Sequence, residues 1–400
     1  MRCGGISKKN SIKEVAVMNE TFEIIVPTLF GLESLVSKEL YRLGYDTSRV
    51  ENGRVTFVGD YDAVCRANMW LRCGERVLIK VGEFKAETQD ELYEGIKALE
   101  WENFIDRRDA FPVKGRTTRS KLASDSSSQK TIKKAIADRL GEEYGISWLP
   151  EDGITYQIQF TIIADVVTVM IDTTGAALHK RGYRQRSNLA PLRETLAAAM
   201  VMLSFWKFEY PLSDPFCGSG TIPIEAAMFK RNIAPGLMRR FSFMDFPQIS
   251  ERMVKDIREE AAAEVHENVR PEIFASDIDP EALELTKHNA KKAGVGEFIN
   301  VFAKDARRIG FKRPQGTIIT NPPYGERLSD IEECKKLYRD IGENFAKLDR
   351  WSYYILTSHE NFEEEFGRKA DRRRKLYNGM IKCCLYQYYG DPPKKKIKGE

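Results

Sequence analysis

After residue 179, short runs rich in β-branched residues alternate with longer segments that repeat apolar side chains every three or four positions. This alternation predicts strands joined by helices, and strands connected in that way lie parallel in one sheet. We expect helices over residues 191–206, 221–230, 248–266, 280–293 and 331–348, and strands over 210–216, 272–277, 298–304, 316–321 and 351–357.

The pattern changes near the end of the chain, where Lys375 begins the run K-L-Y-N-G-M-I-K-C-C-L-Y-Q-Y-Y. An Asn-Gly pair between strand-forming residues is the strongest short-range signal for a β-hairpin. We therefore expect an antiparallel hairpin to close an otherwise parallel sheet.

The region from residue 22 to 172 reads as two smaller α/β units. The first runs strand, helix, strand, helix to about residue 73. The second repeats this order and adds two apolar-rich strands. A polar segment, G-R-T-T-R-S-K-L-A-S-D-S-S-S, separates its second strand from its second helix, and we expect it to be a flexible linker that is basic at its start.

Composition narrows the class of protein. At 400 residues, with 42% apolar and 30% charged residues, the chain exceeds one ordinary core and is not wholly disordered. It has neither an apolar run of about 18 residues nor a secretory signal pattern, so we expect a cytoplasmic protein. Seven cysteines without a C-x-x-C pair indicate neither a zinc site nor a disulfide framework. The net charge of +4 is too small to indicate a nucleic-acid partner by itself.

A glycine-rich turn, D-P-F-C-G-S-G-T, joins a predicted strand to a predicted helix. Backbone can approach a ligand closely there, and the helix N-terminus offers free N–H groups. A dinucleotide site is disfavoured, because Pro223 replaces the third glycine of G-x-G-x-x-G and Asp214 would repel a pyrophosphate. The acid suits a cation instead, such as a sulfonium-bearing amino acid. The predicted cofactor contacts in this turn are Asp214, Phe216, Gly218, Gly220 and Thr221.

Two further acids end neighbouring strands. Asp277 stands where a doubly wound sheet accepts ribose hydroxyls, and Ile278 offers an apolar surface for adenine. Asp305, followed by Ala306, ends the third strand, where an adenine amino group could donate. Each acid could instead cap a helix, which is the simpler interpretation of Asp279. The set at strand ends indicates S-adenosylmethionine as the cofactor.

The strand predicted at 316–321 ends in T-N-P-P-Y-G. The prolines fix two φ angles, remove two N–H donors and favour an extended Asn321. The Asn321 side-chain carbonyl, itself beside the cofactor, and the Pro322 main-chain carbonyl could hold both hydrogens of an exocyclic amine and aim its lone pair at a methyl donor. Tyr324 could stack on a base that leaves its helix or loop. We therefore expect Asn321, Pro322, Pro323 and Tyr324 to be catalytic, without a metal ion.

Two segments are basic, K-G-R-T-T-R-S-K at 114–121 and H-K-R-G-Y-R-Q-R at 179–186, and the second interleaves its Lys and Arg with Tyr183. This pattern suits phosphates and exposed bases. For D-R-R-R-K at 371–375 a solvated face is as good an explanation. The predicted RNA contacts are Lys114, Arg116, Arg119, Lys121, Lys180, Arg181, Tyr183, Arg184 and Arg186.

The chain resembles the class I methyltransferases that modify the exocyclic amine of guanine in RNA, in particular the THUMP-containing bacterial 23S ribosomal RNA type. The resemblance rests on D-P-F-C-G-S-G-T-I-P-I-E-A-A, S-D-I-D-P, T-N-P-P-Y-G-E-R, L-H-K-R-G-Y-R and A-P-L-R-E-T-L-A-A-A. It implies an α/β fold with a Rossmann-like, seven-stranded, mostly parallel sheet, preceded by a ferredoxin-like plus THUMP module. It also implies that Glu194 and Thr195 lie near the methionine end of the cofactor.

These observations predict an S-adenosylmethionine-dependent methyltransferase acting on guanine N2, with ribosomal RNA favoured over transfer RNA and a monomer slightly favoured. An adenine-N6 or glutamine-amide methyltransferase remains an alternative, because the N-P-P-Y corner would serve these amines equally. So does an RNA-binding assembly factor with a vestigial cofactor fold. The expected parts are an extension (1–20), a ferredoxin-like subdomain (21–75), a THUMP domain (76–172), a methyltransferase domain (173–390) and a basic tail (391–400).

Overall fold

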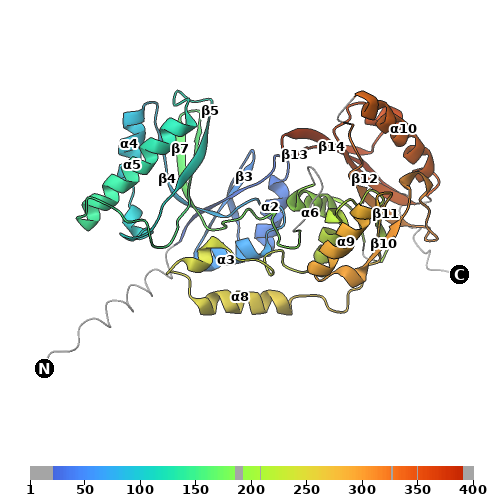
Figure 1. Ribbon diagram of the computed structural model, residues 1–400, viewed down its shortest axis with the longest axis horizontal. Helices are drawn as coiled ribbons and strands as arrows, with labels where there is room; N and C mark the ends of the chain where they lie inside the picture. The colour runs from blue at the N-terminus through green and yellow to red at the C-terminus, as the bar shows by residue number, and fades with distance from the viewer. Residues whose placement is uncertain (1–20, 185–191, 208, 326–327, 349, 391–400) are drawn as a thin grey trace, which may run out of the picture. The chain divides into compact units, whose positions relative to one another are not determined.

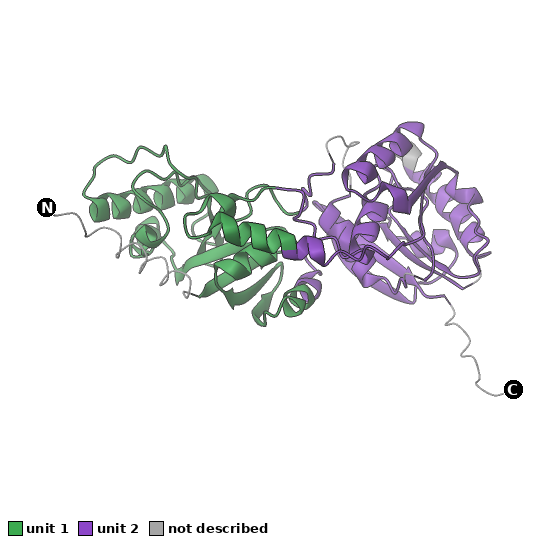
Figure 2. Cartoon of the chain, turned by 90° about the horizontal axis from the view of Figure 1, so that it is seen from below, with its two compact units in different colours: residues 1–28, 37–178, 240–259 green, residues 29–36, 179–239, 260–400 purple. Residues whose placement is uncertain are grey.

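The structure is a computed structural model that describes residues 21–184, 192–207, 209–325, 328–348 and 350–390, with the side chains of 328–330 excepted. The chain divides into two compact units (Figure 2). The first comprises residues 1–28, 37–178 and 240–259, and the second comprises residues 29–36, 179–239 and 260–400. Among the described helices, none is long and apolar enough to cross a lipid bilayer.

The first unit is built on a seven-stranded sheet with strand order β2-β3-β1-β4-β7-β6-β5. Figure 1 labels β3, β4, β7 and β5 among these strands. All its strand pairs are antiparallel except β5 with β6. Its elements are β1 (Phe22–Pro27), α2 (Glu33–Arg42), β2 (Thr47–Glu51), β3 (Arg54–Gly59), α3 (Tyr61–Trp70), β4 (Leu78–Lys85), α4 (Gln89–Lys97), η1 (Trp101–Asn103), β5 (Val113–Thr118), α5 (Asp125–Tyr144), β6 (Ile158–Ile163) and β7 (Val166–Asp172).

The expected flexible linker of this unit is largely regular structure. Strand β5 continues to Thr118, and α5 begins at Asp125 because the Ser124 side chain accepts from the Ser127 N–H at 3.2 Å. A capping serine satisfies an N–H that the helix cannot, and so favours an early start. Strand β2 was not anticipated, because its mostly exposed residues, T-S-R-V-E, lack an apolar alternation.

The second unit carries the other seven-stranded sheet. Its elements are α6 (Glu194–Leu203), β8 (Leu212–Asp214), α7 (Thr221–Lys230), β9 (Ile273–Asp277), α9 (Pro280–Lys292), η3 (Gly296–Phe298), β10 (Ile299–Ala303), η4 (Ala306–Arg308), β11 (Gly316–Thr320), α10 (Leu328–Phe345), β12 (Trp351–Thr357), α11 (Phe362–Phe366), β13 (Arg372–Asn378) and β14 (Ile381–Tyr388). Between α7 and β9 lie η2 (Ser242–Asp245), which belongs to the first unit, and α8 (Glu251–Ala263), of which residues 251–259 belong to the first unit.

The strand order of this sheet is β10-β9-β8-β11-β12-β14-β13. The first five strands run parallel, and β14 joins β12 and β13 antiparallel. The predicted parallel sheet with a closing hairpin is therefore confirmed. Because the carboxyl ends of parallel strands share one edge, the ends of β8, β9, β10 and β11 meet there. The order reverses between β8 and β11, the place where open α/β sheets bind ligands.

An apolar core supports this edge. Ile318, Tyr353 and Ile355 of β11 and β12 pack with Tyr338 and Phe345 of α10, all of them buried. Burying aromatic side chains of this size is among the larger stabilising terms in a core. The packing fixes α10 against the end of β11, so that helix can position the residues that follow the strand.

Candidate functional site

The glycine-rich turn after β8 is shaped by two glycines with positive φ, Gly218 at 52° and Gly220 at 84°. A Cβ on Gly220 would lie 2.9 Å from the Thr286 methyl group, so only glycine allows this approach to α9. At Gly218, by contrast, no heavy atom lies within 4 Å of the Cβ position. Its N–H donates to Asp277 Oδ2 at 3.0 Å. The turn thus leaves open space beside a carboxylate at the end of β9.

Helix α9 holds the turn through two polar side chains that sequence reasoning missed. Thr286 Oγ1 donates to the Gly218 carbonyl at 2.8 Å, and Asn289 Nδ2 donates to the Ser219 carbonyl at 2.9 Å. Both side chains are buried. The sequence feature that could have revealed them is a pair of polar residues three positions apart on the otherwise apolar face of a predicted helix.

Asp214, the last residue of β8, connects the turn to the neighbouring strand. Its Oδ1 accepts from the Thr320 hydroxyl at 2.7 Å and from the Phe216 N–H at 3.2 Å. The side chain is buried, and this burial raises its pKa to about 7. Since Thr320 precedes Asn321, one hydrogen bond joins the glycine-rich turn to the N-P-P-Y corner.

The corner itself is held by one internal hydrogen bond and by two from α10. The Tyr324 hydroxyl donates to Asn321 Oδ1, and burial raises the pKa of this phenol, which keeps it a donor. From α10, Tyr338 donates to the Pro323 carbonyl at 2.7 Å and Cys334 at 3.4 Å. Within the described part of the chain, no group donates to the Pro322 carbonyl. The Pro323 carbonyl thus has two donors, whereas the carbonyl of the buried Pro322 has none among the described residues.

The substitution Tyr338→Phe tests this support. It removes a buried hydroxyl that joins the Pro323 carbonyl to Thr357 Oγ1, 3.1 Å away. We expect the free energy of unfolding to fall by about 1–3 kcal/mol, because the Pro323 carbonyl loses its nearer donor and the buried Thr357 hydroxyl loses a partner. Urea denaturation measures the change, with Tyr41→Phe, an exposed tyrosine, as the control. Equal stability of both variants would contradict the proposed support.

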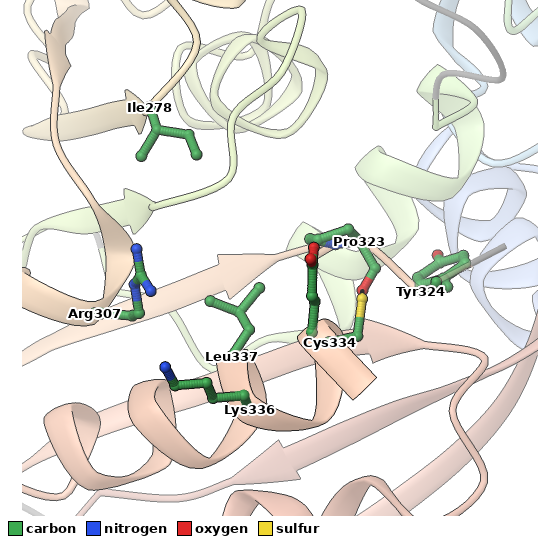
Figure 3. A pocket seen from close by; sticks show the side chains of 9 residues that line it. Ile278, Arg307, Pro323, Tyr324, Cys334, Lys336 and Leu337 are labelled. Atoms are coloured by element: carbon green, nitrogen blue, oxygen red, sulfur yellow. Dashed lines mark hydrogen bonds between the residues drawn. The ribbon is translucent and has the colours of Figure 1, made fainter. Parts of the chain in front are cut away.

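A cavity of about 700 Å³ opens beside the corner, a size typical of small-molecule sites. In Figure 3, Arg307, Lys336 and Leu337 lie on one side of Pro323 and Tyr324 lies on the other. The residues that line the cavity are Ile278, Arg307, Pro323, Tyr324, Gly325, Glu333, Cys334, Lys336 and Leu337. Of these, sequence reasoning had not anticipated Arg307, Gly325 or the residues of α10.

The remaining predicted cofactor contacts differ in their surroundings. Ile278 is exposed at the cavity wall, whereas Ala306 is buried in the core. The Asp305 carboxylate caps η4 and forms an ion pair with Arg307 at 2.6 Å, which lowers its pKa through hydrogen bonding. An adenine amino group would therefore compete with Arg307 for Asp305.

The segment before α6 departs from its predicted role. Arg181 and Tyr183 are 2% and 1% exposed. Tyr183 donates to Glu225 Oε1 at 3.0 Å, and Arg181 Nε lies 3.5 Å from the same oxygen. The prediction that these two side chains contact RNA conflicts with their burial. The run of basic and aromatic residues indicated an exposed surface. Contacts with Glu225 of α7 instead hold Arg181 and Tyr183 in the interior.

Arg184 also faces inward. Its Nη2 donates to the Leu192 carbonyl at 2.8 Å and to Thr221 Oγ1 at 2.6 Å, and its Nε lies 3.4 Å from Glu194 Oε1. Glu194 and Thr195 are buried at the start of α6, and burial raises the pKa of Glu194. Arg184 thus ties α6 to the first residue of α7, which is a role in the protein interior instead of the predicted RNA contact.

The other predicted RNA contacts lie on surfaces. Lys114 and Arg116 are exposed on β5, the edge strand of the first unit, and Arg119 is exposed in the turn after it. Lys121 is exposed but paired with Glu87. Lys180 is exposed in the second unit, and Arg186 lies outside the described residues. No group of acids, histidines or cysteines in the described ranges could hold a metal ion.

Three family models match successive parts of the chain. The RlmL ferredoxin-like domain matches residues 23–78, the THUMP domain matches residues 86–172, and the RMKL-like methyltransferase domain matches residues 181–387. The chain belongs to the RMKL-like methyltransferase family. The resemblance inferred from the sequence motifs is confirmed, as is the predicted fold class.

Full-length relatives agree with this assignment. The methyltransferase is 43% identical over 385 residues to "Putative RNA methyltransferase YpsC" of Bacillus subtilis strain 168, covering 94% of this chain and 99% of the relative. The solved structure described as "SMU.472, a putative methyltransferase complexed with SAH" has a TM-score of 0.89 at 42% identity, and the match covers 94% of this chain and 100% of that chain. A Listeria monocytogenes protein described as a predicted N6-adenine-specific DNA methylase has a TM-score of 0.89 at 43% identity, covering 94% and 98%.

Proposed function

We propose that this protein is an S-adenosylmethionine-dependent RNA methyltransferase that transfers a methyl group to guanine N2, with 23S ribosomal RNA as its substrate. The observation that carries the proposal is the hydrogen bond of 2.7 Å between Thr320 and Asp214. It brings an acceptor-rich corner and a glycine-rich cofactor turn together at the switch point of a parallel sheet.

The residues at this edge fit S-adenosylmethionine. The open space beside Gly218 admits a ligand against the backbone, and the carboxylates of Asp214 and Asp277 suit an ammonium group and ribose hydroxyls. Exposed Ile278 offers an apolar surface for adenine. When bound, S-adenosylmethionine supplies an electrophilic methyl group attached to a positively charged sulfur.

The corner residues orient the acceptor amine. An exocyclic amine is a weak nucleophile, because its lone pair is delocalised into the ring. Asn321 Oδ1 and the Pro322 carbonyl would accept its two hydrogens and favour a pyramidal nitrogen. The Tyr324 hydroxyl, which now donates to Asn321, must yield this acceptor to the amine. The stiffness of the proline pair keeps the acceptors in place through the reaction.

Two observations support RNA as the substrate. The first unit includes a match to the THUMP domain, and a relative 43% identical carries RNA methyltransferase in its name. Lys114 and Arg116 of β5, with Arg119 in the turn that follows the strand, also form an exposed basic strip, and none of them forms an ion pair with another described residue. Such strips neutralise phosphates without reading sequence. The choice of guanine N2 and of 23S RNA rests on the motif resemblance.

Labelled cofactor tests the substrate class. Purified protein is incubated with ribosomal RNA, transfer RNA, DNA and cellular protein from a deletion strain, and the methylated nucleosides are identified by mass spectrometry. We expect N2-methylguanosine in 23S RNA. N2-methylguanosine in transfer RNA alone would contradict the ribosomal target. N6-methyladenine in DNA would instead favour the activity named for the Listeria relative.

A further inference from the structure

The tip of the β13–β14 hairpin, residues 375–382, gathers two lysines and a tyrosine on one face. Tyr377 pairs with Lys382 in the antiparallel register, and Lys375 lies two positions before Tyr377, so the three side chains point to the same side. Both lysines are exposed and Tyr377 is half-buried. Met380, at the turn, is 92% exposed. The tip thus presents cationic and apolar groups together.

The two lysines differ from the arginine that precedes them on the same face. Arg373 is neutralised by Glu363 of α11. No described acid forms an ion pair with Lys375 or Lys382. One of the four cations at 372–375, Arg373, therefore has an acidic partner, whereas the positive charge at the tip is available to a ligand.

The opposite face of the hairpin contacts the catalytic corner. Cys383, which follows Lys382, lies with its Sγ 3.7 Å from the Tyr324 hydroxyl oxygen. Cys383 and its register partner Leu376 are both buried. The hairpin therefore connects an exposed cationic face directly with the residue proposed to stack on the acceptor base.

We propose, as an inference that rests on the proposed function, that this tip binds the RNA strand immediately next to the methylated nucleotide. Lys375 and Lys382 would contact its phosphates, and Tyr377 would stack on a neighbouring base. A flipped base carries a phosphate on either side of its sugar, so anionic groups must pass close to Tyr324. The cofactor does not account for two lysines, because its sulfonium and ammonium charges outweigh its single carboxylate.

An aromatic neighbour strengthens the stacking argument. Phe30 is 45% exposed and meets Tyr377 edge to face, with ring centroids 6.0 Å apart. Single-stranded RNA is bound in this manner, by stacking on aromatic rings beside cations that track the backbone. The half-buried ring of Tyr377 is held in place by this contact, which reduces the entropy lost when a base stacks on it.

A binding assay with the full-length protein tests the proposal. Fluorescence anisotropy measures the affinity for a labelled single-stranded oligoribonucleotide over a range of salt concentrations. The Lys375→Ala/Lys382→Ala variant should bind roughly tenfold more weakly at about 0.1 M salt, and its plot of log affinity against log salt should be shallower by about 1.4, or 0.7 for each phosphate contact. Substitution of both lysines by arginine should restore affinity and slope. Affinity for S-adenosylmethionine should not change.

The matched control is Lys291→Ala/Lys312→Ala. These lysines are exposed, form no ion pair with a described residue, and Lys291 lies beside β10, at the other edge of the sheet from β13. Unchanged binding by the hairpin variant, or an equal loss in the control, would overturn the proposal. If wild-type protein binds the oligonucleotide through the tip but methylates no RNA, the proposed function fails and the binding surface stands. Selective loss of an acidic protein partner, with RNA binding intact, would assign the tip to that partner instead.

Discussion

Asn321→Ala should lower kcat for RNA methylation by about 10²- to 10³-fold while leaving the affinity for S-adenosylmethionine within about twofold. The substitution removes one of the two acceptors that orient the amine. The cofactor turn is held separately, by Thr286 and Asn289 of α9, and the 2.7 Å link to Asp214 comes from Thr320. The substitution should therefore slow methyl transfer itself and leave cofactor binding nearly unchanged.

Two measurements separate chemistry from binding. Single-turnover methylation gives the rate, and isothermal titration calorimetry gives the cofactor affinity. Asn300→Ala is the matched control, because Asn300 is exposed on the edge strand β10. Loss of cofactor binding in Asn321→Ala would show that the residue belongs to the cofactor site first. Turnover within twofold of wild type would remove Asn321 from the proposed mechanism.

Asp214→Asn should weaken S-adenosylmethionine binding and stabilise the folded protein at alkaline pH. Asparagine keeps an oxygen that can accept from Thr320 and Phe216, so the loss is confined to the negative charge. An ionic partner for the ammonium group contributes about 1.5–3 kcal/mol, which corresponds to roughly a 10- to 150-fold increase in Kd.

The effect on stability follows from the raised pKa of Asp214. Burial raises this pKa to about 7 in the folded protein, against an ordinary value of 3.8. Between these values the folded state holds a proton that the unfolded state has lost, so this residue makes wild-type stability fall as pH rises from about 4 to about 7. The variant lacks this titration. Its free energy of unfolding relative to wild type should be about 3 kcal/mol higher at pH 8 than at pH 5.

Urea denaturation at the two pH values measures this difference, and Asp279→Asn, an exposed residue that caps α9, is the control. Calorimetry in buffers of different ionisation enthalpy adds a second readout. A bound ammonium group favours ionised Asp214, so wild-type protein should release a proton on binding near pH 6.5, and the variant should not. A stability difference independent of pH would contradict the assigned ionisation.

The features that the sequence predicted well depend on neighbouring residues. Alternating strand and helix patterns gave the parallel sheet, because side-chain periodicity is local and connected parallel strands have few topologies. The Asn-Gly pair gave the closing hairpin, and the proline pair ended β11 by its own covalent geometry. Parallel strands then require Asp214, Asp277 and Asn321 to share one edge. The residues expected at this edge of the sheet could therefore be predicted from the amino-acid sequence alone.

Burial and partnership, in contrast, depend on residues distant in the sequence. Glu225 on α7 turns Arg181 and Tyr183 inward, and Arg307 occupies the carboxylate of Asp305. Asp214 has its raised pKa because the surrounding elements exclude water from it. The type of a basic or acidic residue indicates its formal charge but not the dielectric constant of its surroundings. Side-chain chemistry was therefore set by sequence, whereas only the packing of the tertiary structure decided which charges face a ligand and which stabilise the interior.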